Sequence, residues 1–267
     1  MILLDKGRLL VAFEPEAELI IKTIRDVNGV MLTEAERFYV NHIVSGLKGI
    51  GIWGKIKALY GFVGGTAATH RWNWKDMRDL DAAYTLSYYG GITHDSKGVS
   101  ANGINGFINT KISSNSINKA SFHCMVYANY TDLSFSSRTF TGIYDTIRTS
   151  INNSSTFSSF TNITTSFDKP ISSNPGVLGL SRASNTESFA YYNDLIVANQ
   201  NNFTTYDISN RKFFLFNRNT DSSLGIDPTL FLKGTISCSM FSEAMTVLEC
   251  KLISHIITTA QGILNRQ

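Results

Sequence analysis

The chain has 267 residues, enough for one large all-β domain with appendages or for two small domains. Hydrophobic residues make up 43% and charged residues 17% of the chain, which excludes wholesale disorder. The 24 basic and 21 acidic residues give a formal net charge of +3. The basic residues are scattered and form no concentrated face, so we expect no nucleic-acid partner.

The three cysteines are too few and too widely spaced for a disulfide framework or a zinc site. We expect Cys238 and Cys250 to be buried as small apolar side chains. No apolar stretch approaches the roughly 18 residues of a membrane span, so no membrane insertion is expected. No secretory signal is visible at the N-terminus, and synthesis in a reducing cytoplasm is the simplest expectation.

Residues 1–13 are predicted to form a short N-terminal arm. Asp5-Lys6-Gly7 supplies a turn between two apolar runs, a pattern typical of a hairpin. The apolar residues that flank this turn are Ile2, Leu3, Leu4, Leu9 and Leu10. Because an isolated two-stranded hairpin is only marginally stable in water, the arm must pack on its own body, on a sister subunit or on a partner.

Residues 14–60 have a helical pattern. Pro15 suits a first helical position, and Asn28-Gly29 ends this helix. A second helix is predicted to begin at a capping box in which Thr33 and Glu36 exchange hydrogen bonds. Residues 52–60 then predict a short third helix.

Residues 61–240 change to short runs separated by loops rich in Gly, Ser, Asn and Thr. Alternation of apolar and polar residues predicts strands at 83–88, 121–127, 176–180, 188–192, 212–216 and 230–232. This spacing indicates a mainly β fold, an antiparallel β-sandwich. Residues 145–168 are predicted to form strands and loops with weak register information.

Residues 241–267 predict a C-terminal amphipathic helix. Thr246 and Glu249 form a second capping box, and Met245 can pack onto Cys250. Apolar residues recur at helical spacing from Leu248 to Leu264. Because one face of such a helix must be covered, we expect it to pack on the body of the protein.

The search for catalytic groups finds none. Glycosidases need two carboxylates about 5–10 Å apart, and the only close acidic pair outside the helices is Asp79 and Asp81. This pair is interpreted as a structural tie or a turn cap. No nucleotide-binding or hydrolase motif occurs, and the five histidines show no metal-ligand spacing. We therefore expect a protein that is not an enzyme, with no metal and no cofactor.

Four aromatic residues are candidates for contact with a glycan. Trp72, Trp74, Tyr88 and Tyr89 lie close together in the sequence. An exposed indole or phenol ring offers a flat apolar platform to a sugar ring. The alternative is that these rings pack in the core, as aromatic residues of sandwiches usually do.

Two segments carry a resemblance to known proteins. Residues Trp53–Thr66 (WGKIKALYGFVGGT) and Thr69–Ala83 (THRWNWKDMRDLDAA) resemble a family of structural proteins of crAss-like and related tailed phages. Weaker similarity runs through Gly179–Arg182, Phe189–Asp194 and the C-terminal helix, so that it spans roughly residues 30–267. The sequence departs from the family pattern at Gly61, Met77, Asp194 and Asn265, which suggests altered turns.

This resemblance implies a concanavalin A-like, or laminin-G-like, sandwich of the head-fibre or capsid-decoration type on the virion. It implies a non-enzymatic homo-oligomer, a dimer or trimer, whose partners are capsid or other virion proteins and host-surface or mucus glycans. The arm, with Ile2, Leu3, Leu4, Leu9 and Leu10, is the candidate anchor to the particle. The alternatives are a tail-fibre adhesin, a glycan-degrading enzyme of the same fold, and a cement protein without a ligand.

Overall fold

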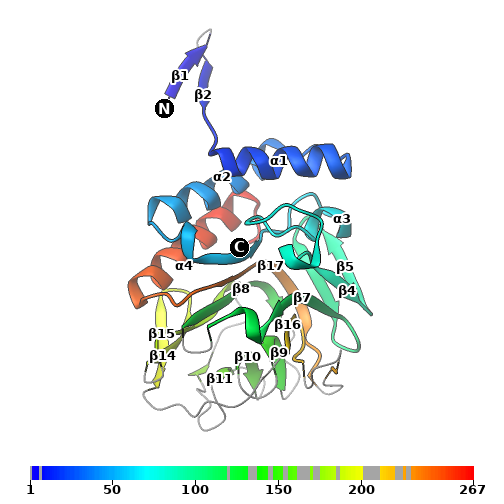
Figure 1. The fold of residues 1–267 in the computed structure, drawn as a ribbon, viewed down its shortest axis with the longest axis vertical. Coiled ribbons are helices and arrows are strands. Elements are labelled where there is room, and N and C mark those ends of the chain that lie inside the picture. Colours follow the sequence, from blue (N-terminus) through cyan, green and yellow to red (C-terminus); the bar gives the residue numbers. More distant parts are fainter. Residues whose placement is uncertain are drawn as a thin grey trace.

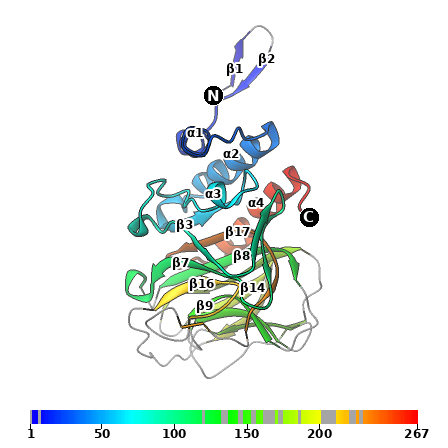
Figure 2. The same cartoon turned by 90° about the vertical axis from the view of Figure 1, so that its right-hand side faces the viewer.

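The fold has three layers. The computed structural model describes residues 2–5, 8–118, 121–131, 137–143, 147–152, 156–160, 169–170, 175–184, 187–200, 211–219, 225–226 and 230–267. A layer of helices covers one β-sheet, and a second sheet stacks on the other side of that sheet (Figures 1 and 2). The predicted fold class, an antiparallel β-sandwich with N-terminal helices and a C-terminal helix, is confirmed.

The helices begin and end where local sequence signals place them. They are α1 (Pro15–Asn28), α2 (Glu34–Gly49), α3 (Ala67–His70) and α4 (Val247–Ile263), with 3-10 turns at Trp53–Lys55, Asp81–Ala83 and Ser114–Ser116. Both predicted capping boxes are present, at the starts of α2 and α4. Gly29 ends α1 with a φ of 68°, a conformation that glycine adopts without strain. None of the described helices has the length and apolar character to cross a membrane.

The sheet beneath the helices, here called the inner sheet, has β17 near its centre. Its strand order is β15 (Leu195–Gln200), β14 (Ser188–Tyr192), β13 (Gly176–Arg182), β8 (Phe122–Thr131), β17 (Lys233–Ser242), β6 (Gly98–Asn102) and β5 (Ile92–Asp95). The first half of β17 pairs with β6, and its last residues pair with β3 (Ile56–Tyr60). All described pairings are antiparallel. Because β8 pairs along the other edge of β17, β3 and β6 share one edge of that strand.

The second sheet, here called the outer sheet, closes the sandwich. Its described strand order is β12 (Lys169–Pro170), β11 (Thr156–Phe160), β10 (Ile147–Asn152), β9 (Ser137–Ile143), β16 (Lys212–Leu215), β7 (Phe107–Ser113) and β4 (Ser87–Tyr89). A hairpin of β1 (Ile2–Asp5) and β2 (Arg8–Val11) forms a sheet of its own and projects beyond α1 (Figure 1). The predicted N-terminal hairpin is thereby confirmed.

The inner sheet is buried on both faces. One hydrophobic core lies between this sheet and the helices and includes Ile20, Val44, Met240 and Ile257. The other core lies between the two sheets. Every described residue of β13 is buried, as expected for a strand with packed layers on both sides. All three cysteines are buried and free, as expected for Cys238 and Cys250.

The predicted helix over residues 52–60 is wrong. Trp53–Lys55 makes a 3-10 turn, and Ile56–Tyr60 continues as strand β3. The last residues of β17 would otherwise have an unpaired edge within the sheet, and pairing with β3 satisfies that edge. Tertiary pairing therefore overrides the local helical pattern. Residues 230–232, predicted as a strand, instead precede β17.

Candidate functional site

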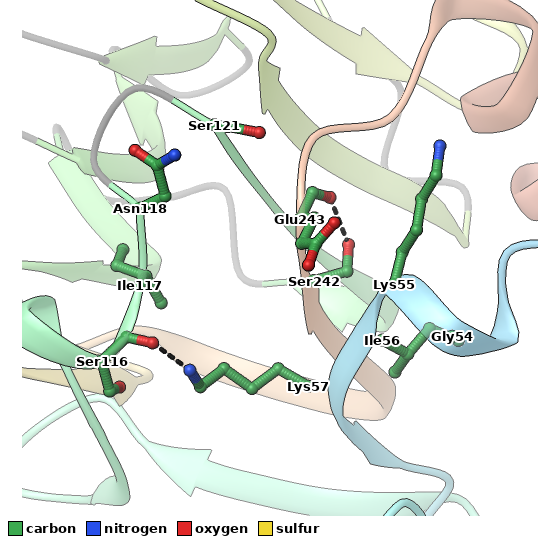
Figure 3. Close-up of a pocket in the computed structure, with 10 residues that line it drawn as sticks. All are labelled: Gly54, Lys55, Ile56, Lys57, Ser116, Ile117, Asn118, Ser121, Ser242 and Glu243. Carbon is green, nitrogen blue, oxygen red and sulfur yellow. Dashed lines mark hydrogen bonds between the residues drawn. The ribbon is translucent and has the colours of Figure 1, made fainter.

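A polar pocket opens where β3 begins and β17 ends (Figure 3). Its volume is about 480 Å³. It is lined by Gly54, Lys55, Ile56, Lys57, Ser116, Ile117, Asn118, Ser121, Ser242 and Glu243. These residues come from three chain segments that the pairing of β3 and β8 with β17 brings together.

Two lysines reach the pocket from β3 and the turn before it. Lys55 ends the 3-10 turn and Lys57 lies in β3, and both line the pocket with buried Ile56 between them. The Lys57 ammonium donates to the Ser116 carbonyl across the pocket, as Figure 3 shows. The Lys55 ammonium pairs with Glu249 of α4 at 2.5 Å. The two positive charges are therefore held at separate walls of the pocket.

The opposite wall is a turn rich in hydroxyl groups. The Ser113 side chain accepts from the Asn115 amide at 3.0 Å, and the Ser116 hydroxyl donates to the Ser113 carbonyl at 2.7 Å. The Ser121 amide donates to the Asn118 carbonyl at 2.9 Å, which closes the turn. These local bonds fix the side of the pocket that lies before β8.

The floor is formed where β17 ends. Buried Ser242 donates from its hydroxyl to the Glu243 carbonyl at 2.9 Å. The Glu243 amide donates to the Lys55 carbonyl at 3.0 Å. The side chain of Glu243 is exposed and lines the pocket. Among the lining residues that the structure describes, it carries the single carboxylate.

Glu249 is the second acidic group near the pocket, and its pKa is shifted in the direction opposite to that of a glycosidase general acid. Burial by itself would raise the pKa of Glu249, but hydrogen bonds from Lys55 and from Thr246 outweigh it and lower that pKa. The general acid of a glycosidase needs a raised pKa. In the described part of the chain, no group of three or more His, Cys, Asp or Glu side chains is arranged to hold a metal ion.

Trp72 and Trp74, two of the predicted glycan contacts, lie in the core under the helices. They are 2% and 4% exposed. The Trp72 indole donates to the Asn28 side chain at 2.8 Å, and Trp74 packs edge-on against Tyr39. Neither ring can offer a face to a sugar, which corrects the glycan-contact hypothesis for both and favours the core-packing alternative.

The other two predicted contacts lie at the edge strand β4, and the structure does not bring them into the pocket. The Tyr88 hydroxyl is buried, and its ring meets His94 edge-on at 4.4 Å. Tyr89 is 36% exposed, and its ring stacks on Phe107 at 4.8 Å. Of the four aromatic candidates, Tyr89 is the most exposed to solvent.

The predicted structural role of the acidic pair agrees with the structure. Asp79 pairs with Arg71, and Asp81 pairs with Lys111 at 2.5 Å. The candidate anchor residues lie in the β1–β2 hairpin, where Leu3 pairs with Leu10 and Leu4 with Leu9. Their side chains, and that of Ile2, lie outside the described residues.

The pocket itself is a site that sequence reasoning missed. The signal available in the sequence was weak, a Lys-x-Lys pair and a Ser-Glu pair in separate regions. Lys55 and Glu249, which meet at its edge, are 194 positions apart. Only the pairing of β3 with β17 makes them neighbours.

No protein-family model matches this chain, and no curated protein matches it either. Solved structures do match. Domain 4 of an extracellular arabinanase from Geobacillus stearothermophilus, in complex with arabinotriose, is 17% identical with a TM-score of 0.51. That match covers 75% of this chain and 98% of the arabinanase domain.

Sialidases of Trypanosoma rangeli also match. The complex with sialic acid is 9% identical with a TM-score of 0.53, and the match covers 76% of this chain and 32% of the sialidase. This chain therefore spans about a third of the sialidase. At such identities the likeness shows the fold alone, a β-sandwich.

Proposed function

We propose that this chain is a carbohydrate-binding β-sandwich whose polar pocket receives a saccharide without cleaving it. The observation that carries the proposal is the mixture of groups in one cavity of about 480 Å³. Sugar hydroxyls both donate and accept hydrogen bonds. The pocket offers lysine donors, serine hydroxyls that do both, and the Glu243 carboxylate as an acceptor.

The structural neighbours support a saccharide as the ligand class. The arabinanase domain that matches over nearly its whole length was solved with arabinotriose, and the matching sialidase with sialic acid. Both molecules are therefore suitable first probes. A pocket of this size suits a mono- or disaccharide unit of a longer chain.

The carboxylates support binding without cleavage. Hydrolysis by the usual mechanism needs two carboxylates on either side of the scissile bond. Glu243 lines the pocket, whereas Glu249 is tied to Lys55 and has a lowered pKa. Incubation of the protein with arabinan or sialylated glycans should release no sugar, and release that depends on Glu243 would favour the glycan-degrading alternative.

Glu243→Gln tests the pocket directly. The change keeps the shape of the side chain and removes its charge, so affinity for a bound saccharide should fall about tenfold. Glu18→Gln is the matched control, because Glu18 is an exposed glutamate on α1, away from the pocket. Calorimetry with arabinotriose and sialic acid, after a glycan array, measures both variants. Equal affinity of the two variants would contradict the proposal.

The resemblance of residues 53–66 and 69–83 to phage structural proteins supports display on a virion. We propose a homo-oligomer, a dimer or trimer, attached to capsid or other virion proteins as a head fibre or decoration protein. Several weak pockets on one particle would bind host-surface or mucus glycans tightly through avidity. Reconstruction of the intact particle tests this role, since density on the tail would favour a tail-fibre adhesin instead.

The hairpin β1–β2 is proposed as the attachment element. It pairs with no other described strand and projects beyond α1 (Figure 1). Deletion of residues 1–13 should therefore abolish incorporation into particles while the sandwich remains folded. Circular dichroism controls for folding, and normal incorporation of the shortened chain would refute the attachment role.

A further inference from the structure

A buried histidine stands directly behind the floor of the pocket. His123 lies in β8, is 1% exposed, and is paired in register with Ser242 of β17. Its Nδ1 is 3.0 Å from the Ser242 hydroxyl oxygen, and its Nε2 is 2.7 Å from the Tyr191 hydroxyl oxygen of β14. Both ring nitrogens thus have partners, as a buried polar group requires.

Burial keeps this imidazole neutral. It lowers the pKa of His123 to about 3, mainly because a charged ring would be desolvated. A neutral imidazole carries one N–H and one lone pair, so one nitrogen donates and the other accepts. The partners of the ring decide which nitrogen donates.

The neighbouring groups assign the proton to Nδ1. The Ser242 hydroxyl donates its single proton to the Glu243 carbonyl at 2.9 Å. The Ser242 oxygen then accepts from His123, so Nδ1 carries the proton. Nε2 keeps its lone pair and accepts from the Tyr191 hydroxyl.

The opposite tautomer, with the proton on Nε2, makes weaker bonds. In that tautomer Ser242 would donate to Nδ1, and the Glu243 carbonyl would lose this donor. His123 would then donate to the Tyr191 oxygen, and Tyr191 would donate to its neighbour Cys250. A thiol sulfur is a weak acceptor, so the chain of bonds that starts from the Nδ1 proton is the more stable one.

The effect of this chain reaches the pocket at Glu243. The carbonyl of Glu243 is held by Ser242, and its amide is held by the Lys55 carbonyl at 3.0 Å. Both backbone groups of the residue are therefore fixed, while its carboxylate lies free at the pocket wall (Figure 3). His123 itself does not line the pocket and acts through Ser242.

We propose that His123 is a positioning residue for the saccharide pocket: held as the Nδ1-protonated tautomer, it orients Ser242 and so fixes the place of Glu243. The part of this inference that concerns binding rests on the proposed function. The part that concerns the tautomer and the backbone of Glu243 does not.

The tautomer is measured on the wild-type protein without any saccharide. In protein labelled with ¹⁵N-histidine, a long-range ¹⁵N–¹H spectrum at pH 7 distinguishes the two neutral tautomers. We expect a protonated Nδ1 and an unprotonated Nε2 for the His123 ring, assigned by the loss of its signals in a His123 variant. A protonated Nε2 would overturn the inference.

Two substitutions separate the two ring nitrogens. His123→Asn places an amide nitrogen near the position of Nδ1, whereas His123→Gln places one near that of Nε2. We expect His123→Asn to keep the affinity for arabinotriose or sialic acid, whichever the wild type binds, within about twofold. His123→Gln should weaken it about tenfold. Equal affinities of these two variants would overturn the inference.

Ser239→Ala is the control for an effect on stability alone. Ser239 lies on β17, as Ser242 does, is buried, and donates to the Met125 carbonyl at 3.2 Å. This variant should lower the free energy of unfolding and leave affinity unchanged, because Ser239 has no contact with the His123 chain of hydrogen bonds. A loss of affinity in Ser239→Ala would show that the effect of His123→Gln reflects stability, against the inference.

Failure of the proposed function can be distinguished from failure of this inference about His123. If the wild type binds neither saccharide, hydrogen exchange of the Glu243 amide still reports its position. This exchange should be faster in His123→Gln than in His123→Asn, and equal rates would overturn the inference. If neither variant folds, the tautomer of the wild-type ring decides it.

Discussion

At the scale of single residues, the side chain of Arg266 links the C-terminal residues to the inner sheet and to α2. It is 2% exposed, and its guanidinium donates to the Ser96 carbonyl at 2.7 Å and to the Phe62 carbonyl at 2.9 Å. The same group lies over the Tyr39 ring at 5.6 Å. The C-terminal residues are therefore tied to the sheet and to α2 together.

Arg266→Met should lower the free energy of unfolding by about 2–4 kcal/mol, because the buried Phe62 carbonyl and the part-buried Ser96 carbonyl lose their donor while the apolar stem is kept. Urea denaturation measures the change. Arg25→Met is the control, since Arg25 is an exposed side chain paired with Asp26 and should have little effect. A loss in Arg266→Met no larger than in the control would contradict this account.

Gly61 marks a second single-residue constraint, at a position where the resembled phage proteins have proline. A Cβ atom added at Gly61 would lie 1.9 Å from the Trp74 ring. The indole of Trp74 thus occupies the space that a side chain at position 61 would need. The altered turn expected from the sequence is in this way linked to the burial of a tryptophan.

Gly61→Ala should destabilise the protein by about 1–3 kcal/mol through overpacking against this ring. Gly49→Ala is the matched control: a Cβ there meets nothing within 4 Å, and the change should raise stability by up to about 1 kcal/mol. Thermal unfolding of the two variants gives opposite shifts if the steric argument holds. A stable Gly61→Ala protein would show that the indole moves freely.

At the scale of elements, α4 combines a local start signal with a tertiary role. Thr246 accepts from the Glu249 amide, and Glu249 accepts from the Thr246 amide. The same Glu249 also pairs with Lys55 at the edge of the pocket. One capping residue therefore begins the helix and connects it to the turn before β3.

Thr246→Ala should cost about 1 kcal/mol of stability, because a helix N-terminus loses its side-chain acceptor. The comparison is Thr259→Ala, an exposed position within α4 where alanine has the higher helix propensity, so that no loss is expected. Urea titration of both variants is sufficient. An equal change in the two would show that the cap contributes nothing measurable.

At the scale of the whole molecule, the double-sided burial of the inner sheet decides how the protein responds to acid. Four histidines lie in or beside packed layers, and desolvation is the largest cause that lowers the pKa of each: His42, His70, His94 and His123. For His70 and His123 the pKa falls to about 3. These rings stay neutral in the folded state at pH values where the unfolded chain binds protons.

Stability should therefore be fully present above about pH 6.5 and decrease as the pH falls from 6.5 towards 3. The sign follows because the unfolded state binds more protons in this window. His70 and His123, whose pKa values fall to about 3, each contribute a slope that approaches about 1.4 kcal/mol per pH unit below pH 6.5. Urea unfolding at pH 7.5, 6 and 5 measures this trend, and a constant free energy of unfolding between pH 7.5 and 5 would contradict it.

Local signals in the sequence determined the ends of the helices and the class of the fold. Pro15, Gly29 and the capping boxes at Thr33 and Thr246 act within a few residues of themselves, so they can be interpreted without a structure. The alternation around Cys124 and along residues 188–192 likewise predicted β8 and β14. Such short-range patterns hold because they depend on backbone geometry alone.

Tertiary structure decided the rest. The pattern of residues 52–60 is helical, yet Ile56–Tyr60 forms a strand that pairs with the open edge of β17. The sequence named Trp72 and Trp74 as possible ligand contacts, and packing buried them. The pocket and the His123 chain of bonds join residues far apart in sequence, and no local pattern records such contacts, because burial and pairing depend on which distant segments share a layer.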